Sequence, residues 1–244
     1  MTVASAPKRL VVACAVLTLA GCSSAPDDTV TILAASSLAD VMPQIVALAE
    51  QDNPDETLEV SYAASSQIVQ QLNAGIQADV AILAGEEPLE SVDSSVDISA
   101  PQIIATNTLA IAVAPGNPGK VTSHNDLGRD NLSLVVCAEQ VPCGLAAAAM
   151  FTKADVTPRI ASFEPDVRAT LSRVASGEAD AGVVYVTDLV GQSVDSVEVS
   201  PEFQFVNSYP ALSVGDSARG DAFVDFLGSD APQKVLRDAG FGAP

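Results

Sequence analysis

Residues 166–188 read DVRATLSRVASGEADAGVVYVTD and contain a predicted helix followed at once by a predicted strand. Val167, Leu171 and Val174 recur at the spacing that places side chains on one face of a helix. Gly177 is typical of a residue just past a helix end, and the apolar run AGVVYV has the length and β-branched content of a buried strand. A helix that leads directly into a buried strand is typical of α/β proteins.

The same alternation of strand and helix patterns extends over most of the chain. Short apolar runs predict strands, and apolar residues at helical spacing predict the helices between them. We therefore predict the α/β class, with mixed, mostly parallel sheets flanked by helices. The predicted strands span residues 30–35, 57–64, 78–84, 109–114, 132–138 and 181–186, and the predicted helices span 38–49, 68–72, 145–151, 167–174, 218–227 and 232–239.

No linker rich in Gly or Ser divides the chain into consecutive domains. Extended stretches near residues 106–109 and 208–212 are instead the expected crossings between two parts of the fold. We therefore predict a lobe 1 built from residues 30–107 plus 209–244, and an inserted lobe 2 built from residues 108–208.

The N-terminus has the pattern of an export signal. Lys8 and Arg9 precede an apolar run over residues 10–19, which is far shorter than the ~20 residues needed to span a bilayer. The run ends in LAGC at 19–22, which resembles the lipobox of bacterial lipoproteins and implies lipid attachment to Cys22. An ordinary signal peptide with an incidental cysteine is the alternative. The predicted signal peptide spans residues 1–21 and the predicted tether spans residues 22–29.

The chain is strongly acidic, with 31 Asp and Glu against 11 Lys and Arg and a formal net charge of −20. Removal of residues 1–21 takes away two basic residues and no acidic one, so 9 basic residues remain and the net charge becomes −22. Nucleic-acid binding through phosphate contacts requires a basic surface, so this class of function is excluded. The hydrophobic content of 48% is too high for a disordered chain.

Two of the four cysteines remain once Cys14 leaves with the signal and Cys22 carries a lipid. Cys137 and Cys143 are six positions apart, and outside the cytoplasm we expect such a pair to form a disulfide. A metal site is the alternative, but it needs more ligands, and His124 is the one histidine of the chain. We therefore predict no residues that bind a metal cation, and we expect His124 at the surface without a ligand role.

Four predicted junctions between a strand and a helix carry groups that suit an anion. In α/β sheets such junctions meet at one edge, where the first turns of helices present free backbone N–H groups. Serines there also serve as helix caps, which is the alternative interpretation of the Ser-Ser pairs. Three of the four junctions have no Lys or Arg, and Arg168 follows the turn of the fourth. The junctions read AASSL at 34–38, YAASS at 62–66, VPCG at 141–144 and EPDVR at 164–168.

A site built from neutral donors favours an oxyanion that carries no proton. A protonated phosphate would leave its O–H group without an acceptor, at a cost of ~1–3 kcal/mol. Asp166 can supply such an acceptor, so phosphate is disfavoured rather than excluded.

The motifs at these junctions resemble those of the periplasmic molybdate-binding proteins of ABC importers. AASSL, YAASS and VPCG take part in this resemblance together with NAGIQADV at 73–80, and the long block at 166–188 is its most specific element. The resemblance extends in order from Val30 to Phe241. It implies a two-lobed periplasmic-binding-protein fold of type II, with molybdate or tungstate held in the cleft between the lobes.

The resemblance also implies which residues contact the oxyanion. Where the family commonly has VPAG this chain has VPCG, but a contact through the backbone amide does not require an alanine. For Tyr185, a packed aromatic side chain at a strand end is the alternative. Whether Asp166 or Asp188 assists binding stays open, and we expect Asp188 to brace a turn. The implied contacts are the hydroxyl and backbone of Ser37, Ser65, the backbone amides of Cys143 and Val167, and the hydroxyl of Tyr185.

We therefore expect an extracytoplasmic receptor, anchored by lipid to the cell membrane, that captures molybdate and tungstate and delivers them to an inner-membrane ABC permease. Molybdenum is expected as the oxyanion, without a further cofactor, and the receptor is expected to be a monomer. A receptor for sulfate or another tetrahedral oxyanion is the first alternative. A hydrolase with Ser37 or Ser65 as nucleophile lacks a G-x-S-x-G motif, so no enzyme is expected. A structural or adhesive lipoprotein is the remaining alternative.

Overall fold

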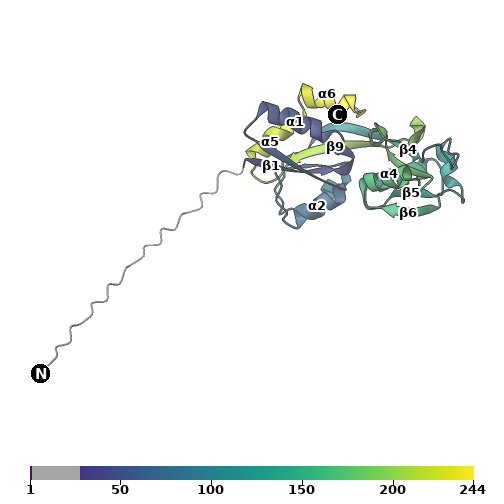
Figure 1. Cartoon of the computed structure of the whole chain (residues 1–244), viewed down its shortest axis with the longest axis horizontal. Coiled ribbons are helices and arrows are strands. Elements are labelled where there is room, and N and C mark those ends of the chain that lie inside the picture. The colour runs from purple at the N-terminus through teal and green to yellow at the C-terminus, as the bar shows by residue number, and fades with distance from the viewer. Residues whose placement is uncertain (2–27) are drawn as a thin grey trace.

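The computed structural model describes Met1 and residues 28–244, which Figure 1 shows as a cartoon. The signal peptide predicted up to residue 21, the lipid site predicted at Cys22 and most of the predicted tether lie outside the described residues. Among the described helices, none combines the length and the apolar character that a membrane crossing requires.

The strands of the described chain form one continuous mixed sheet, in the order β2-β1-β3-β9-β4-β7-β5-β6, with β8 paired to β4. β1 is parallel to β2 and β3, and β5 is parallel to β6 and β7. β4 and β9 are antiparallel to their neighbours. The strands are β1 (Thr29–Ala35), β2 (Thr57–Ala63), β3 (Val80–Ile82), β4 (Gln102–Val113), β5 (Leu134–Cys137), β6 (Ile160–Glu164), β7 (Ala181–Tyr185), β8 (Asp195–Glu198) and β9 (Val206–Ser213).

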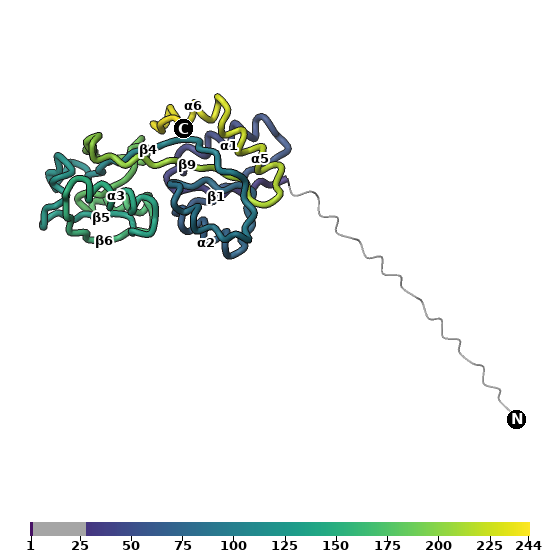
Figure 2. Tube along the Cα trace, turned by 180° about the vertical axis from the view of Figure 1, so that it is seen from behind, coloured from purple at the N-terminus to yellow at the C-terminus, as the bar shows by residue number. Residues whose placement is uncertain are grey.

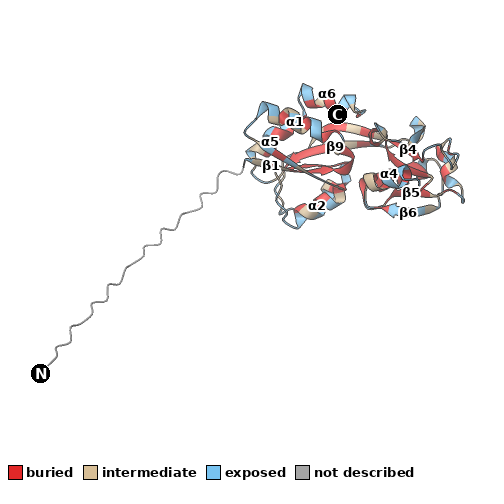
Figure 3. Ribbon diagram, in the orientation of Figure 1, coloured by how far each residue is buried: buried red, intermediate tan, exposed pale blue. Residues whose placement is uncertain are grey.

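Helices cover both faces of this sheet, and they bury their apolar sides against it (Figure 3). In α4, for example, the predicted face of Val167, Leu171 and Val174 is buried. This arrangement confirms the predicted α/β class with flanking helices. The α-helices are α1 (Met42–Asp52), α2 (Ser65–Asn73), α3 (Pro142–Lys153), α4 (Val167–Ala175), α5 (Ala218–Leu227) and α6 (Asp230–Asp238), and the 3-10 helices are η1 (Ser36–Leu38), η2 (Glu87–Ser91), η3 (His124–Gly128), η4 (Val186–Leu189) and η5 (Pro201–Phe203).

Strands β4 and β9 connect the two ends of the sheet. Residues 102–108 of β4 pair with β9, whereas residues 109–113 pair with β7 and β8. The two views in Figures 1 and 2 show these strands passing between two compact bodies. The stretches predicted as crossings, near residues 106–109 and 208–212, both lie within β4 and β9.

Buried apolar side chains gather on both sides of this crossing. One cluster takes nearly all of its members from residues 109–199, and two others take theirs from residues 30–105 and 209–241. We therefore use the names lobe 1 and lobe 2 in their predicted bounds, and the division itself stays a prediction.

Helix α1 begins later than the apolar spacing predicts. The chain first forms the short helix η1, and α1 then starts at Met42 with Pro43 as its second residue. Proline lacks an N–H group, which is harmless in the first turn of a helix and disruptive further along. The position of Pro43 therefore places the start of α1 after the two serines, and Ser37 lies in a separate turn between β1 and α1.

Candidate functional site

The first turns of η1, α2, α3 and α4 meet at one small cavity between the two lobes. Its volume is about 20 Å³, and the end of β7 completes its wall. All five residues that the resemblance predicts as oxyanion contacts line this cavity: Ser37, Ser65, Cys143, Val167 and Tyr185. The structure therefore brings them together from positions up to 148 residues apart in the sequence, and their role as contacts stays a prediction. The other lining residues are Ala35, Ser36, Ala63, Ala64, Ala84, Pro142 and Asp166.

Three α-helices direct their N-terminal ends at this cavity. Helix α2 begins at Ser65, α3 at Pro142 and α4 at Val167. Amides in the first turn of a helix have no acceptor within that helix, and the helix dipole makes this end positive. The amides of Cys143 and Val167 therefore suit an anion, and no basic side chain is needed for the attraction.

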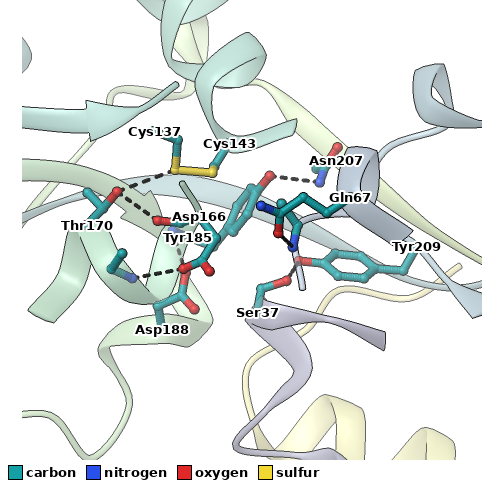
Figure 4. Close-up of a disulfide and its surroundings, with 12 residues drawn as sticks. Ser37, Gln67, Cys137, Cys143, Asp166, Thr170, Tyr185, Asp188, Asn207 and Tyr209 are labelled. Carbon is teal, nitrogen blue, oxygen red and sulfur yellow. Dashed lines mark hydrogen bonds between the residues drawn. A yellow bond between two sulfur atoms is a disulfide. The ribbon is translucent and has the colours of Figure 1, made fainter. Parts of the chain in front are cut away.

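The hydroxyl groups of Ser37, Ser65 and Tyr185 at the cavity are each held by a hydrogen bond from another part of the protein, and Figure 4 shows those of Ser37 and Tyr185. Ser65 Oγ accepts from the amide of Ala84 at 2.8 Å. Tyr185 OH accepts from Nδ2 of Asn207 at 2.9 Å, and Ser37 Oγ lies 2.9 Å from Tyr209 OH. These contacts fix the positions of all three hydroxyls relative to the cavity.

Three buried residues behind the hydroxyls were not predicted from the sequence. Asn107 on β4 and Asn207 and Tyr209 on β9 support the site from the crossing strands, although none of them lines the cavity. The signal in the sequence is weak, because a polar residue in an apolar strand also fits a simple sheet position. Burial raises the pKa of Tyr185 and of Tyr209, so both hydroxyls keep their protons at neutral pH.

A disulfide lies directly beside the cavity. Cys137 at the end of β5 is bonded to Cys143 in the first turn of α3, as predicted, with the two Cα atoms 5.7 Å apart. The next residue, Gly144, approaches β5 so closely that an added Cβ atom would lie 2.0 Å from the carbonyl oxygen of Ala138. The disulfide and this contact together hold the turn that presents the Cys143 amide.

The cavity has a single charged residue among the described residues of its wall. No Lys or Arg is among the described residues that line it, and Asp166 is its one charged lining residue. Asp166 Oδ1 accepts from the amide of Ala169 at 2.9 Å, so this carboxylate caps α4. The wall of the cavity therefore consists of neutral donors, small apolar side chains and one carboxylate, of which one oxygen caps α4.

Asp188 lies three positions after Tyr185, in η4, and is buried. Its Oδ2 atom accepts from the amide of Tyr185 at 2.9 Å, which matches the predicted role as a turn brace. Its Oδ1 atom has no hydrogen-bond partner among the described residues. Burial raises the pKa of Asp188 to about 7, because the Tyr185 amide and the charge of Arg168 offset only part of the cost of desolvation.

The expectation for the position of His124 is wrong. This residue is buried, and its ring packs against Phe203 with 4.4 Å between the ring centroids. His124 is a buried residue of η3 in lobe 2, and the ring of Phe203 covers it from solvent. His124 does not line the cavity.

The chain matches a known protein family over almost all of its described length. Residues 30–242 match the model of the bacterial extracellular solute-binding protein family. The molybdate-binding protein ModA of Mycobacterium tuberculosis is 33% identical over 223 residues, which cover 88% of this chain and 85% of that protein.

Solved structures of two binding proteins share the fold. The periplasmic molybdate-binding protein of Azotobacter vinelandii aligns with a TM-score of 0.78 and 17% identity, over 88% of this chain and 99% of that one. The sulfate-binding protein SubI of Mycobacterium tuberculosis aligns with a TM-score of 0.73 and 18% identity, over 87% of this chain and 86% of that one. Proteins named for different tetrahedral oxyanions therefore share this architecture.

Proposed function

This chain belongs to the bacterial extracellular solute-binding protein family, and we propose that it captures molybdate, and tungstate with it, for delivery to an inner-membrane ABC permease. We further propose that it works outside the cytoplasm, as a monomer anchored by a lipid on Cys22. The proposed contacts are those implied by the sequence: Ser37, Ser65, Cys143, Val167 and Tyr185.

One observation supports this proposal above the others, namely that the cavity offers hydrogen-bond donors from both lobes without a basic side chain. Ser37 and Ser65 come from lobe 1, whereas Cys143, Val167 and Tyr185 come from lobe 2. A tetrahedral oxyanion without a proton accepts hydrogen bonds on every side. Such a ligand matches a wall of hydroxyl and amide donors and would hold the two lobes together.

The choice of molybdate over sulfate rests on the relative in Mycobacterium tuberculosis that is named a molybdate-binding protein. The fold alone does not make this choice, because a sulfate-binding protein shares it. A receptor for sulfate or another tetrahedral oxyanion is therefore the second candidate. Both candidates use the same cavity and differ in the size of the anion.

A larger hollow elsewhere on the molecule is a poor candidate for an anion. It has a volume of about 460 Å³ and is lined in part by Asp79, Asp97 and Asp216. Carboxylates repel a dianion, whereas helix N-termini attract one. The smaller cavity therefore has the more suitable chemistry.

The surroundings of the serines favour binding over catalysis. A serine nucleophile needs a neighbouring base that accepts its proton. Ser65 Oγ instead accepts a hydrogen bond from the Ala84 amide, and His124 of η3 is packed against Phe203 of η5. We therefore propose a receptor and no enzyme.

Isothermal calorimetry on protein lacking residues 1–22 tests the proposal with molybdate, tungstate, sulfate and phosphate. We expect tight binding of molybdate and tungstate and weak or no binding of the other two. Ser37→Ala and Ser65→Ala together should weaken molybdate binding at least tenfold, while Ser172→Ala, at an exposed position of α4, should not. Tight binding of sulfate or phosphate alone would overturn the assignment of molybdate.

A further inference from the structure

We infer that Asn107, Asn207 and Tyr209 set the direction of the hydroxyl protons of Ser37 and Tyr185 at the anion cavity, so that the cavity binds deprotonated oxyanions more tightly than protonated ones. This inference rests on the proposed function and names three positioning residues for it. None of the three lines the cavity, so their influence must pass through Tyr185 and Ser37.

The two asparagines lie opposite each other at the crossing between the lobes. Asn107 on β4 and Asn207 on β9 are register partners in the antiparallel ladder. Their exposed fractions are 3% and 2%, so their amide groups need partners within the protein. Both amides find these partners among hydroxyl groups at or next to the cavity.

The first branch runs from Asn207 to Tyr185. Asn207 Nδ2 lies 2.9 Å from Tyr185 OH, and an amide nitrogen can only donate. Tyr185 OH is therefore the acceptor in this bond, and its own proton is not used there. Because Tyr185 lines the cavity, this proton is available to a ligand.

The second branch runs from Asn107 through Tyr209 to Ser37. Asn107 Oδ1 accepts from the amide of Thr108 at 2.9 Å, which fixes the orientation of the side-chain amide. Its Nδ2 atom then donates to Thr187 Oγ1 at 2.7 Å and to Tyr209 OH at 3.3 Å.

The hydroxyl of Tyr209 connects Asn107 to Ser37 at the cavity through two hydrogen bonds. This hydroxyl accepts from Asn107, and among the described residues Ser37 Oγ at 2.9 Å is the one acceptor left for the buried tyrosine proton, so Tyr209 donates to Ser37. Ser37 thereby becomes an acceptor on the side of Tyr209, and its proton is available to the cavity. Tyr209 is fully buried, so no water competes for this bond.

The hydroxyl proton of Ser65 is also free for the ligand, although neither asparagine donates a hydrogen bond to this residue. Its Oγ atom accepts from the amide of Ala84 at 2.8 Å, so its proton is also available. The hydroxyls of Ser37, Ser65 and Tyr185 therefore each accept one hydrogen bond from the protein already. Together with the amides of Cys143 and Val167, they form a wall that donates to the ligand.

A protonated oxyanion such as hydrogen phosphate needs an acceptor for its own O–H group. Asp166 is the one carboxylate at the cavity, and its Oδ1 atom accepts from the Ala169 amide, which leaves Oδ2 as the single carboxylate acceptor for such a group. An O–H group that faces Ser37, Ser65 or Tyr185 instead meets donors, is left unpaired and weakens binding. The hydrogen bonds from Asn207 to Tyr185, and from Asn107 through Tyr209 to Ser37, form a relay. This relay thus favours molybdate, tungstate and sulfate over hydrogen phosphate.

The test replaces a donor by an acceptor of the same shape. In Asn207→Asp the introduced carboxylate accepts from Tyr185 OH, so the tyrosine proton turns away from the ligand. We expect the affinity for molybdate to fall at least tenfold at pH 8 and the affinity for hydrogen phosphate to fall less. A purely structural role would lower both affinities by the same factor and would overturn the inference.

A double-mutant cycle separates proton direction from simple repulsion by the added charge. If Asn207→Asp acts through the tyrosine proton, most of its effect disappears in a Tyr185→Phe background. An undiminished effect in that background would contradict the inference. Asn53→Asp, an exposed position that follows α1, controls for one added negative charge and should leave the affinity unchanged.

The second branch gives an independent test if Asn207→Asp does not fold. Asn107→Asp should reverse Tyr209 and Ser37 in the same way, and its effect should disappear in a Ser37→Ala background. Persistence of the effect in that background would overturn the inference for this branch. Unaltered protein that binds no tetrahedral oxyanion refutes the proposed function itself, whereas binding with equal loss for all anions refutes only the relay.

Discussion

The guanidinium group of Arg168 holds the carboxylate of Asp40 with two hydrogen bonds, at 2.6 Å and 3.1 Å. Arg168 belongs to α4 in lobe 2, and Asp40 lies between η1 and α1 in lobe 1. Asp40 follows Ser37 by three residues, and Arg168 is next to Val167. The ion pair therefore bridges the predicted lobes beside the anion cavity.

Loss of this ion pair should make a bound anion leave faster. We expect Arg168→Gln to raise the dissociation rate of molybdate up to about fivefold, because a partly exposed ion pair contributes at most about 1 kcal/mol. The association rate should change less, since mutations at one interface act mainly on dissociation. Stopped-flow measurements of fluorescence or competition give both rates.

The matched control for this prediction is Arg173→Gln on the same helix. Arg173 pairs with Glu164 and Glu178, which both lie within lobe 2. This variant should leave the dissociation rate of molybdate near that of the unaltered protein. Equal effects of the two variants would show that the bridge between the lobes is not the cause.

The disulfide should support both stability and affinity. Closing the short loop between Cys137 and Cys143 is expected to contribute about 2 kcal/mol to the free energy of unfolding. Reduction should remove this contribution and weaken molybdate binding by a few-fold, because Cys143 is in the turn that presents the amide. Urea unfolding and calorimetry, each with and without reductant, measure the two effects.

A variant with Cys137→Ala and Cys143→Ala provides the control for the reductant. It should show the lower stability from the outset and should not respond to reductant. A response of this variant would mean that the reductant acts elsewhere on the protein.

The sequence predicts α4 and β7 well, because their apolar patterns allow one interpretation each. By contrast, β6 was not predicted, since residues Ile160–Glu164 alternate between partly buried and exposed positions at the end of the sheet. β8 and β9 were also missed. β8 is short and mostly exposed, and the sequence predicts the region of β9 near residues 208–212 as an extended crossing. The pairing of β9 with β4 and β3 depends on residues about 100 and about 130 positions away, respectively, which local patterns do not register.

The difference between local patterns and distant pairings also explains which part of the site the sequence predicts. Ser37 and Ser65 follow strands directly, so the rule for strand ends and helix starts places them together. Asn107 and Asn207 act through the register between two strands that are distant in the sequence. Nothing in either local sequence marks that register, so their support of Tyr185 and Tyr209 became visible only in the structure.

Gly144 should be indispensable to the cavity. A Cβ atom added there would lie 2.0 Å from the carbonyl oxygen of Ala138, and backbone must move to relieve this overlap. We expect Gly144→Ala to lower the free energy of unfolding by about 1–3 kcal/mol and the affinity for molybdate at least tenfold, because the first turn of α3 is displaced. Chemical unfolding and calorimetry on the same preparations measure both quantities.

Gly128→Ala is the matched control for this change. A Cβ atom at Gly128 meets the side chain of Val156 at 3.5 Å, which is an ordinary contact. We expect little change in stability or affinity there. If Gly144→Ala behaves like Gly128→Ala, the close approach to β5 does not hold the site in place.

Asp188 should make the stability of the protein depend on pH. Its pKa of about 7 in the folded protein lies above the ordinary value of 3.8, so the folded state binds the proton more tightly than the unfolded state. The associated stabilisation is complete below the ordinary value and is lost as the pH rises through about 7. Asp188→Asn, which cannot ionise, should therefore gain stability relative to the unaltered protein between pH 5 and pH 8, by about 2 kcal/mol.

Urea unfolding of both proteins at pH 5, 6, 7 and 8 measures this difference. Asp216→Asn, at an exposed position, controls for the loss of one negative charge and should show no such trend. The replacement keeps an oxygen that can accept from the Tyr185 amide, so the turn after β7 should persist. A difference between Asp188→Asn and the unaltered protein that stays constant with pH would mean that burial does not govern this carboxyl group.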